Sequence, residues 1–199
     1  MARPLTRYSI VAILLHWLIA AFILFNLWLG LSVEGRHGAA KINAFELHQS
    51  IGMTVLALSI LRLGWRLANP PPPEAPGIAH WEKSVSGLVH GAFYVIMIGM
   101  PLTGWLMVSA GANGAHMALW RMGDFQGFGW PRLPLVAALP TARREAVQGA
   151  SFAVHTYLSY GAYVLILLHI AGALKHQIFD PNPVLPRMLP FLKRRSQSP

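Results

Sequence analysis

Residues 151–177 read SFAVHTYLSYGAYVLILLHIAGALKHQ and lie largely within an uncharged run from Ala146 to Leu174. A helix needs about 20 apolar residues to cross a bilayer, so this run is long enough to span one. His155, His169 and His176 follow one another at intervals of 14 and 7 residues. Because seven residues make nearly two helical turns, the three imidazoles are predicted to share one helix face.

The first two of these histidines are predicted to lie near opposite sides of the membrane. Their separation of 14 residues corresponds to roughly 21 Å along a helix axis. Small residues on or beside the same stripe leave room for a flat, wide group against the helix: Ser159, Ala162, Gly172 and Ala173.

The composition indicates a membrane protein. Of the 199 residues, 54% are hydrophobic and only 12% are charged, which is too little charge for the surface of a soluble domain. The chain has no cysteine, which excludes disulfides, thiolate metal sites, iron–sulfur clusters and covalent haem attachment. The net charge of +9 is attributed to Lys and Arg at the membrane edges and to contact with anionic lipid, rather than to nucleic-acid binding.

Four transmembrane helices are predicted in one domain, at about 8–32, 44–67, 84–109 and 150–177. The segment 110–148, rich in Gly, Pro and Trp, is expected to form an outer loop with short interfacial helices. The positive-inside rule places both termini in the cytoplasm, including a tail over 178–199. Ten cations then lie inside: Arg3, Arg7, Arg62, Arg66, Lys83, Lys175, Arg187, Lys193, Arg194 and Arg195. Six lie outside: Arg36, Lys41, Arg121, Arg132, Arg143 and Arg144.

Matching depths pair four of the histidines. His48 begins the second helix at the outer level of His155, and His16 lies on the first helix at the inner level of His169. An imidazole in hydrocarbon is costly unless it is paired or ligated. Two pairs at two levels are what bis-histidine ligation of haem in a four-helix bundle requires. The sequence therefore predicts an all-α, four-helix membrane bundle that encloses two b-type haems.

Depth alone leaves the inner pair open. His90 also lies at the inner level, so it could replace His16 as the partner of His169, or hydrogen-bond a haem propionate or a quinone. Arg62 follows His48 by 14 residues and reaches the inner level, where it could pair with a propionate or serve as a membrane-edge anchor. The other three histidines are predicted to be solvated: His37, His80 and His116.

Four segments carry a resemblance that covers nearly the whole chain. They are RYSIVAILLHW, ELHQSIGMTVLALSILRLGWRL followed by NPPPP, GLVHGAFYVIMIGMPLTGW, and the 151–177 stretch followed by LPRMLP. With these segments the sequence resembles the four-helix bacterial cytochrome b561 family, and the long outer loop conforms least. The resemblance implies that His16 pairs with His169 and that His48 pairs with His155. It also implies a bacterial inner-membrane electron carrier with two b haems that exchanges electrons with quinone.

Within that family the chain resembles superoxide oxidases, and this resemblance implies oxidation of superoxide at the outer haem and reduction of ubiquinone at the inner one. Histidine suits proton donation to a quinone because it titrates near neutral pH. His176 is therefore the first candidate for the quinone site, with His90 and Arg62 as lesser ones, although an interfacial histidine beside Lys175 explains His176 equally well. The outer cations could attract an anion.

Two other functions are compatible with the sequence. One is a cytochrome that passes quinol electrons to a separate periplasmic or membrane-bound redox protein. The other, of a different class, is a histidine-lined metal transporter. The sequence leaves the oligomeric state open.

Overall fold

Four long helices make up most of the structure, a computed structural model that describes residues 7–73, 77–111, 117–121, 125–180 and 184–189. They are α1 (Ile10–Val33), α2 (Gly38–Ala68), α3 (His80–Ala110) and α5 (Thr141–Ile178). The smaller elements are β1 (Met117–Leu119), β2 (Phe128–Trp130), α4 (Pro134–Ala137) and the 3-10 helix η1 (Leu185–Arg187). The predictions made for Arg3, His116, Lys193, Arg194 and Arg195 lie outside the described residues.

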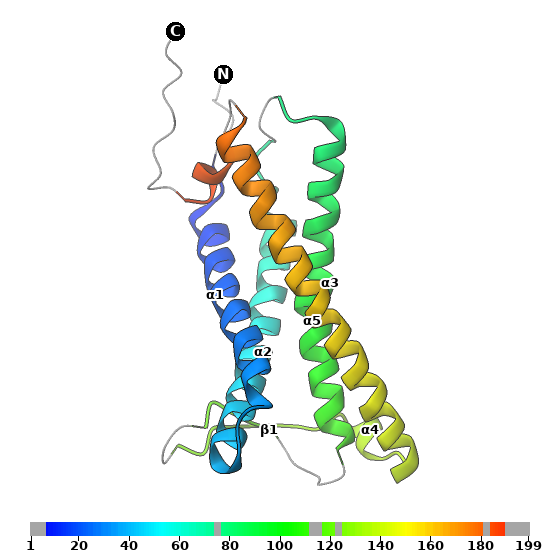
Figure 1. The fold of residues 1–199 in the computed structure, drawn as a ribbon. Helices are drawn as coiled ribbons and strands as arrows, with labels where there is room; N and C mark the ends of the chain where they lie inside the picture. The colour runs from blue at the N-terminus through cyan, green and yellow to red at the C-terminus, as the bar shows by residue number, and fades with distance from the viewer. Residues whose placement is uncertain (1–6, 74–76, 112–116, 122–124, 181–183, 190–199) are drawn as a thin grey trace.

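The helices form an up-and-down bundle in which α1 pairs with α2 and α3 pairs with α5 (Figure 1). The two pairs join mainly where α2 packs along α3. The beginning of α1 and the end of α5 lie at the same end of the bundle, and η1 packs there against α5. We call this the inner end, and the end that carries β1 and α4 the outer end.

All four long helices are apolar enough and long enough to cross a membrane. Their outward faces carry large apolar side chains, as expected for a surface that faces lipid. Examples that are at least 55% exposed are Ile10, Leu14, Leu31, Leu88, Val95, Leu167 and Leu168. The predicted four-helix membrane fold is confirmed.

Three helices extend beyond the ranges expected from hydropathy. α2 begins at Gly38 instead of about 44, and α5 begins at Thr141 instead of about 150. The added segments, GAAKIN and TARREAVQG, are polar but contain Ala, Lys, Arg and Glu, which favour helix and continue it beyond the lipid. α3 begins at His80 instead of about 84, where the Glu82 side chain accepts a hydrogen bond from the backbone N–H of Ala79 at 3.2 Å.

The described residues of the loop predicted over 110–148 include two strands that were not predicted from the sequence. β1 and β2 form an antiparallel pair. Gly127, just before β2, has a φ of +76°, and a Cβ at this position would lie 2.5 Å from the carbonyl oxygen of Leu119. The backbone N–H of Trp120 donates to the hydroxyl of Ser50 on α2 at 2.8 Å. Nε of Arg132 donates to the carbonyl oxygen of Ser109 on α3 at 3.0 Å. The loop is thus fastened to both helix pairs and fixes the outer end of the bundle.

Candidate functional site

The outer histidine pair joins α2 to α5. The imidazole centroids of His48 and His155 lie 6.1 Å apart, with an angle of 66° between the ring planes. The sequence predicted this proximity from depth alone. The structure shows that the two rings also face each other across the bundle.

A backbone carbonyl fixes the orientation of each outer ring. Nδ1 of His48 lies 3.2 Å from the carbonyl oxygen of Asn26 on α1. Nδ1 of His155 lies 3.0 Å from the carbonyl oxygen of Met100 and 3.0 Å from Oγ1 of Thr103, both on α3. Since a carbonyl only accepts, Nδ1 carries the hydrogen in both rings. Each Nε2 therefore offers a lone pair, which is the tautomer that ligating histidines adopt.

A glycine on the same neighbouring helix lies beside each outer ring. A Cβ at Gly30 would lie 3.2 Å from Cε1 of His48, and a Cβ at Gly104 would lie 3.5 Å from Cε1 of His155. In both helices the glycine follows the residue that supplies the carbonyl by four positions, which is about one turn. Sequence reasoning missed both contacts, because a lone glycine gives no sign of which neighbouring side chain approaches it.

Three histidines meet at the inner level. The ring centroids of His16 and His169 lie 6.1 Å apart with an interplanar angle of 65°, which repeats the outer geometry. His90 also contacts His169, at 5.5 Å and 84°. Nδ1 of His90 donates to the carbonyl oxygen of Ser86 on its own helix at 2.7 Å. The rings of His16 and His169 make no hydrogen bond within the described ranges.

Both 6.1 Å pairs fit a single metal centre between two imidazoles. A bond from a metal ion to an imidazole nitrogen is about 2 Å long, and the ring centroid lies about 1 Å behind that nitrogen. One metal ion held between two rings therefore sets their centroids about 6 Å apart. Within the described residues there is no cluster of three or more His, Asp or Glu side chains arranged to hold a metal ion by themselves.

An apolar layer separates the two histidine levels. Ala162, seven residues from both His155 and His169, is 2% exposed and packs with Leu27 of α1 and Ile96 of α3. The sequence predicted that Ala162 leaves room for a flat group, but this position is filled by neighbouring side chains. The reason is that a small residue allows the helices themselves to approach closely.

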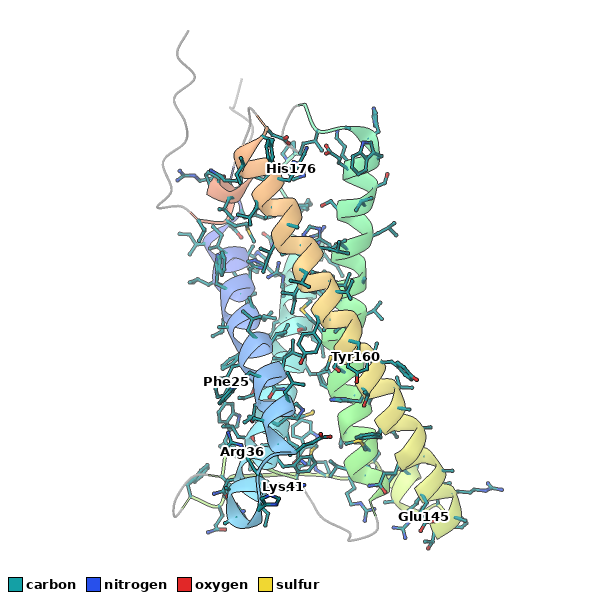
Figure 2. All side chains as sticks on the ribbon, in the orientation of Figure 1. Phe25, Arg36, Lys41, Glu145, Tyr160 and His176 are labelled. Carbon is teal, nitrogen blue, oxygen red and sulfur yellow. The ribbon has the colours of Figure 1, made fainter. Side chains whose placement is uncertain are left out.

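His176 lies at the inner end of α5 (Figure 2), where it belongs to a charged network. Its Nδ1 lies 2.5 Å from Oδ2 of Asp180. Lys175 bridges Oδ1 of Asp180 at 2.9 Å and Oε1 of Glu82 at 2.7 Å. Hydrogen bonds from His176 and then Lys175 hold the pKa of Asp180 below its ordinary value, because they stabilise the carboxylate. Sequence reasoning missed Asp180, although its position four residues after His176 was a readable signal.

Arg62 lies where the sequence placed it, at the inner level. It lies within electrostatic range of His16, His90 and His169. It also lines a pocket at the inner end together with Arg66 and Tyr94.

Comparison with known proteins assigns the family. The model of the prokaryotic cytochrome b561 family matches residues 7–191. The chain belongs to this family. The chain is 28% identical to cytochrome b561 homolog 2 of Escherichia coli (strain K12) over 92% of this chain and 91% of the relative. It is 32% identical to cytochrome b562 of Cereibacter sphaeroides over 55% of this chain and 73% of the relative.

A third relative is the probable superoxide oxidase CybB of Yersinia pestis, which is 24% identical over 92% of this chain and 96% of the relative. Family membership and the four apolar helices make this cytochrome b561 protein a multi-pass membrane protein. Its family binds haem b and transfers electrons in the membrane.

Proposed function

We propose that this cytochrome b561 protein is an oxidoreductase that oxidises superoxide at the outer end and reduces ubiquinone at the inner end. The observation that carries the proposal is the repetition of one ring geometry, 6.1 Å at 65° and 66°, at two levels of α5. In this proposal His48 and His155 ligate one haem b, and His16 and His169 ligate a second. Haem b supplies one-electron chemistry when it is bound.

The choice of His16 over His90 as the inner ligand rests on the matched geometry. His16 repeats the outer separation, whereas the His90 ring lies closer to His169 and almost perpendicular to it. Nδ1 of His90 is bonded to its own helix, so its Nε2 is the nitrogen left to contact a bound group. We assign His90 to a hydrogen bond with a propionate or a quinone.

The net reaction is 2 O₂•⁻ + Q + 2 H⁺ → 2 O₂ + QH₂, which balances in atoms and charge. Its substrate is an anion, and the cations at the outer end support its approach. Arg121 is paired with Glu46 at 2.7 Å, and Arg132 is bonded to backbone carbonyls. Arg36 and Lys41 near the α1–α2 turn (Figure 2), together with Arg143 and Arg144 on α5, are left to supply the attraction. Lys41 precedes His48 on α2 by seven residues, or about two turns.

Reduction of the quinone requires two protons, and the inner end of α5 supplies groups to donate them. Asp180 binds Nδ1 of His176, which leaves the opposite ring nitrogen for a quinone oxygen. The 24% identity to a probable superoxide oxidase supports superoxide as the electron donor. The proposed orientation places this end and both termini in the cytoplasm of a bacterium, where protons are drawn from the cell interior.

The decisive experiment is to give superoxide to the purified, haem-loaded protein with ubiquinone and to follow ubiquinol formation. We expect ubiquinol to form faster than without protein, and His176→Ala to slow its formation while leaving haem content unchanged. A rate equal to the uncatalysed one would favour a carrier for a separate redox protein. Colourless purified protein, without Soret and α bands, would favour the metal transporter.

A further inference from the structure

A pocket at the inner end of the bundle lies between four segments of the chain. It is lined by Arg62, Arg66 and Asn69 near the end of α2, by Tyr94 of α3, and by Tyr8 and Met188 from the two ends of the described chain. The backbone N–H of Tyr8 donates to the carbonyl oxygen of Arg187 at 3.4 Å. Trp17 Nε1 donates to the carbonyl oxygen of Met188 at 2.9 Å. The segment 184–189 is therefore fastened beside the pocket.

The two guanidinium groups in this pocket have no negatively charged partner among the described residues. Arg62 and Arg66 are four residues apart on α2, so they occupy the same helix face and repel each other. Neither makes a hydrogen bond or an ion pair with any of the residues that the structure describes. Cations near the membrane that have no counter-ion are costly, and an oxyanion that bridges both groups would remove that cost.

Tyr94 adds a second, independent sign of a missing ligand. Its hydroxyl oxygen is fully buried and has no hydrogen-bond partner among the described residues. A buried hydroxyl without a partner is unfavourable, and native proteins rarely tolerate it. Tyr94 lines the same pocket as the two arginines, and its hydroxyl can donate to the same kind of acceptor as their guanidinium groups.

The surroundings of the pocket are those expected at a membrane interface. On α1, Ile10 is 75% exposed and Leu14 is 64% exposed, so the lipid-facing surface begins just after Tyr8. Trp65, which also lines the pocket, donates from Nε1 to the hydroxyl of Ser9 at 3.1 Å. Tryptophan with its apolar ring in lipid and its N–H bonded to a polar group is typical of the membrane interface.

We propose that this pocket binds the phosphate of an anionic phospholipid. Arg66 and Tyr94 hold the phosphate, and Arg62, one turn deeper, adds its charge. A haem propionate is the other source of an oxyanion here, and it would come from the deeper side, where Arg62 lies within electrostatic range of the inner histidines. Arg66 lies one turn further out than Arg62 and is exposed. This position favours a lipid headgroup over a propionate as the source of the oxyanion. The proposal concerns lipid binding and does not depend on the identity of the electron donor or acceptor.

The test compares thermal unfolding of the haem-loaded protein in detergent with added phosphatidylglycerol or phosphatidylcholine. At a lipid concentration 100 times the dissociation constant, linkage predicts that phosphatidylglycerol raises Tm by roughly 5–10 °C. Arg66→Gln and Tyr94→Phe should each lose most of this rise. Arg143→Gln, which removes an exposed cation from the outer end, should retain it.

Three results would overturn the proposal. The first is an equal rise with phosphatidylcholine, or an undiminished rise in both pocket variants. The second is an equal rise with inorganic phosphate alone, which would show an oxyanion site without a lipid. The third is a loss of haem from Arg66→Gln with no response to lipid in the parent protein, which would assign the pocket to a propionate. Because the readout is Tm, failure of ubiquinol formation would leave the lipid result unaffected.

Discussion

Gly30 of α1 lies so close to His48 of α2 that an added Cβ would meet Cε1 of the imidazole at 3.2 Å. The His48 imidazole also donates to the carbonyl oxygen of Asn26, which lies on α1 with Gly30. The ring therefore has little freedom to move away from Gly30. We predict that Gly30→Ala displaces His48, costs about 1–3 kcal/mol of stability and lowers occupancy of the proposed outer haem. Haem content per chain and the unfolding temperature measure both effects.

Gly104→Ala is the matched control. Its Cβ would lie 3.5 Å from Cε1 of His155, which is an ordinary van der Waals contact. Alanine also favours helix over glycine by up to about 1 kcal/mol. Gly104→Ala should therefore keep full haem content and equal or greater stability. Equal behaviour of the two variants would show that ring crowding does not control occupancy.

The proposed ligand pairs predict separable haem losses. His48→Ala or His155→Ala should remove the outer haem and retain the inner one, because the apolar layer around Ala162 keeps the two levels apart. Haem content should fall from two per chain to one, and the remaining haem should keep its low-spin spectrum. Loss of both haems in either variant would show that the two sites assemble together.

His16 and His90 predict opposite outcomes at the inner level. His16→Ala should remove the inner haem, since it takes away the ring that lies 6.1 Å from His169. His90→Ala should retain two haems and alter only the inner spectrum or its potential. Retention of two haems by His16→Ala, with loss of one by His90→Ala, would make His90 the ligand.

Charge reversal at the outer end should slow the reaction with superoxide. Lys41→Glu replaces an attractive charge two turns from His48 with a repulsive one. We expect roughly a tenfold lower rate at low ionic strength, and a smaller difference as salt screens the charge. Lys83→Glu makes the same change of charge at the inner end and should have little effect on this rate. Equal effects of the two variants would refute local steering.

The Asp180 carboxylate predicts a pH-dependent contribution to stability. Because its folded pKa is lowered by His176 and Lys175, the contribution is complete above the unfolded pKa of about 3.9 and is lost as pH falls through the folded pKa. Asp180→Asn should therefore have a lower unfolding temperature than the parent at neutral pH. The difference in unfolding temperature should shrink below about pH 4. A difference that stays constant down to pH 2 would contradict this assignment.

Much of the site could be predicted because its residues repeat along regular helices. Helical rise converts the spacing of His155 and His169 directly into depth, and the absence of charge fixes which helices cross the lipid. The depth of His48 and His16 then follows from the same count. The family segments, matched over residues 7–191, agree with this arrangement.

Depth along a helix carries no information about its rotation or its neighbours. Only the packing of α1 on α2 and of α3 on α5 placed Gly30 beside His48 and Gly104 beside His155. The strand pair of the outer loop escaped prediction for a related reason. Its strands are three residues long, and bonds to distant residues such as Ser50 and Ser109 hold it in place.

The sequence by itself determined the membrane class, the four spans and the two levels of histidine, since each depends on local hydropathy and a constant rise per residue. Tertiary structure alone decided which rings face each other, which carbonyls orient them, and that Arg62 and Arg66 share a pocket with Tyr94. These relationships depend on side chains from different helices, and their contacts are set by packing rather than by position in the chain.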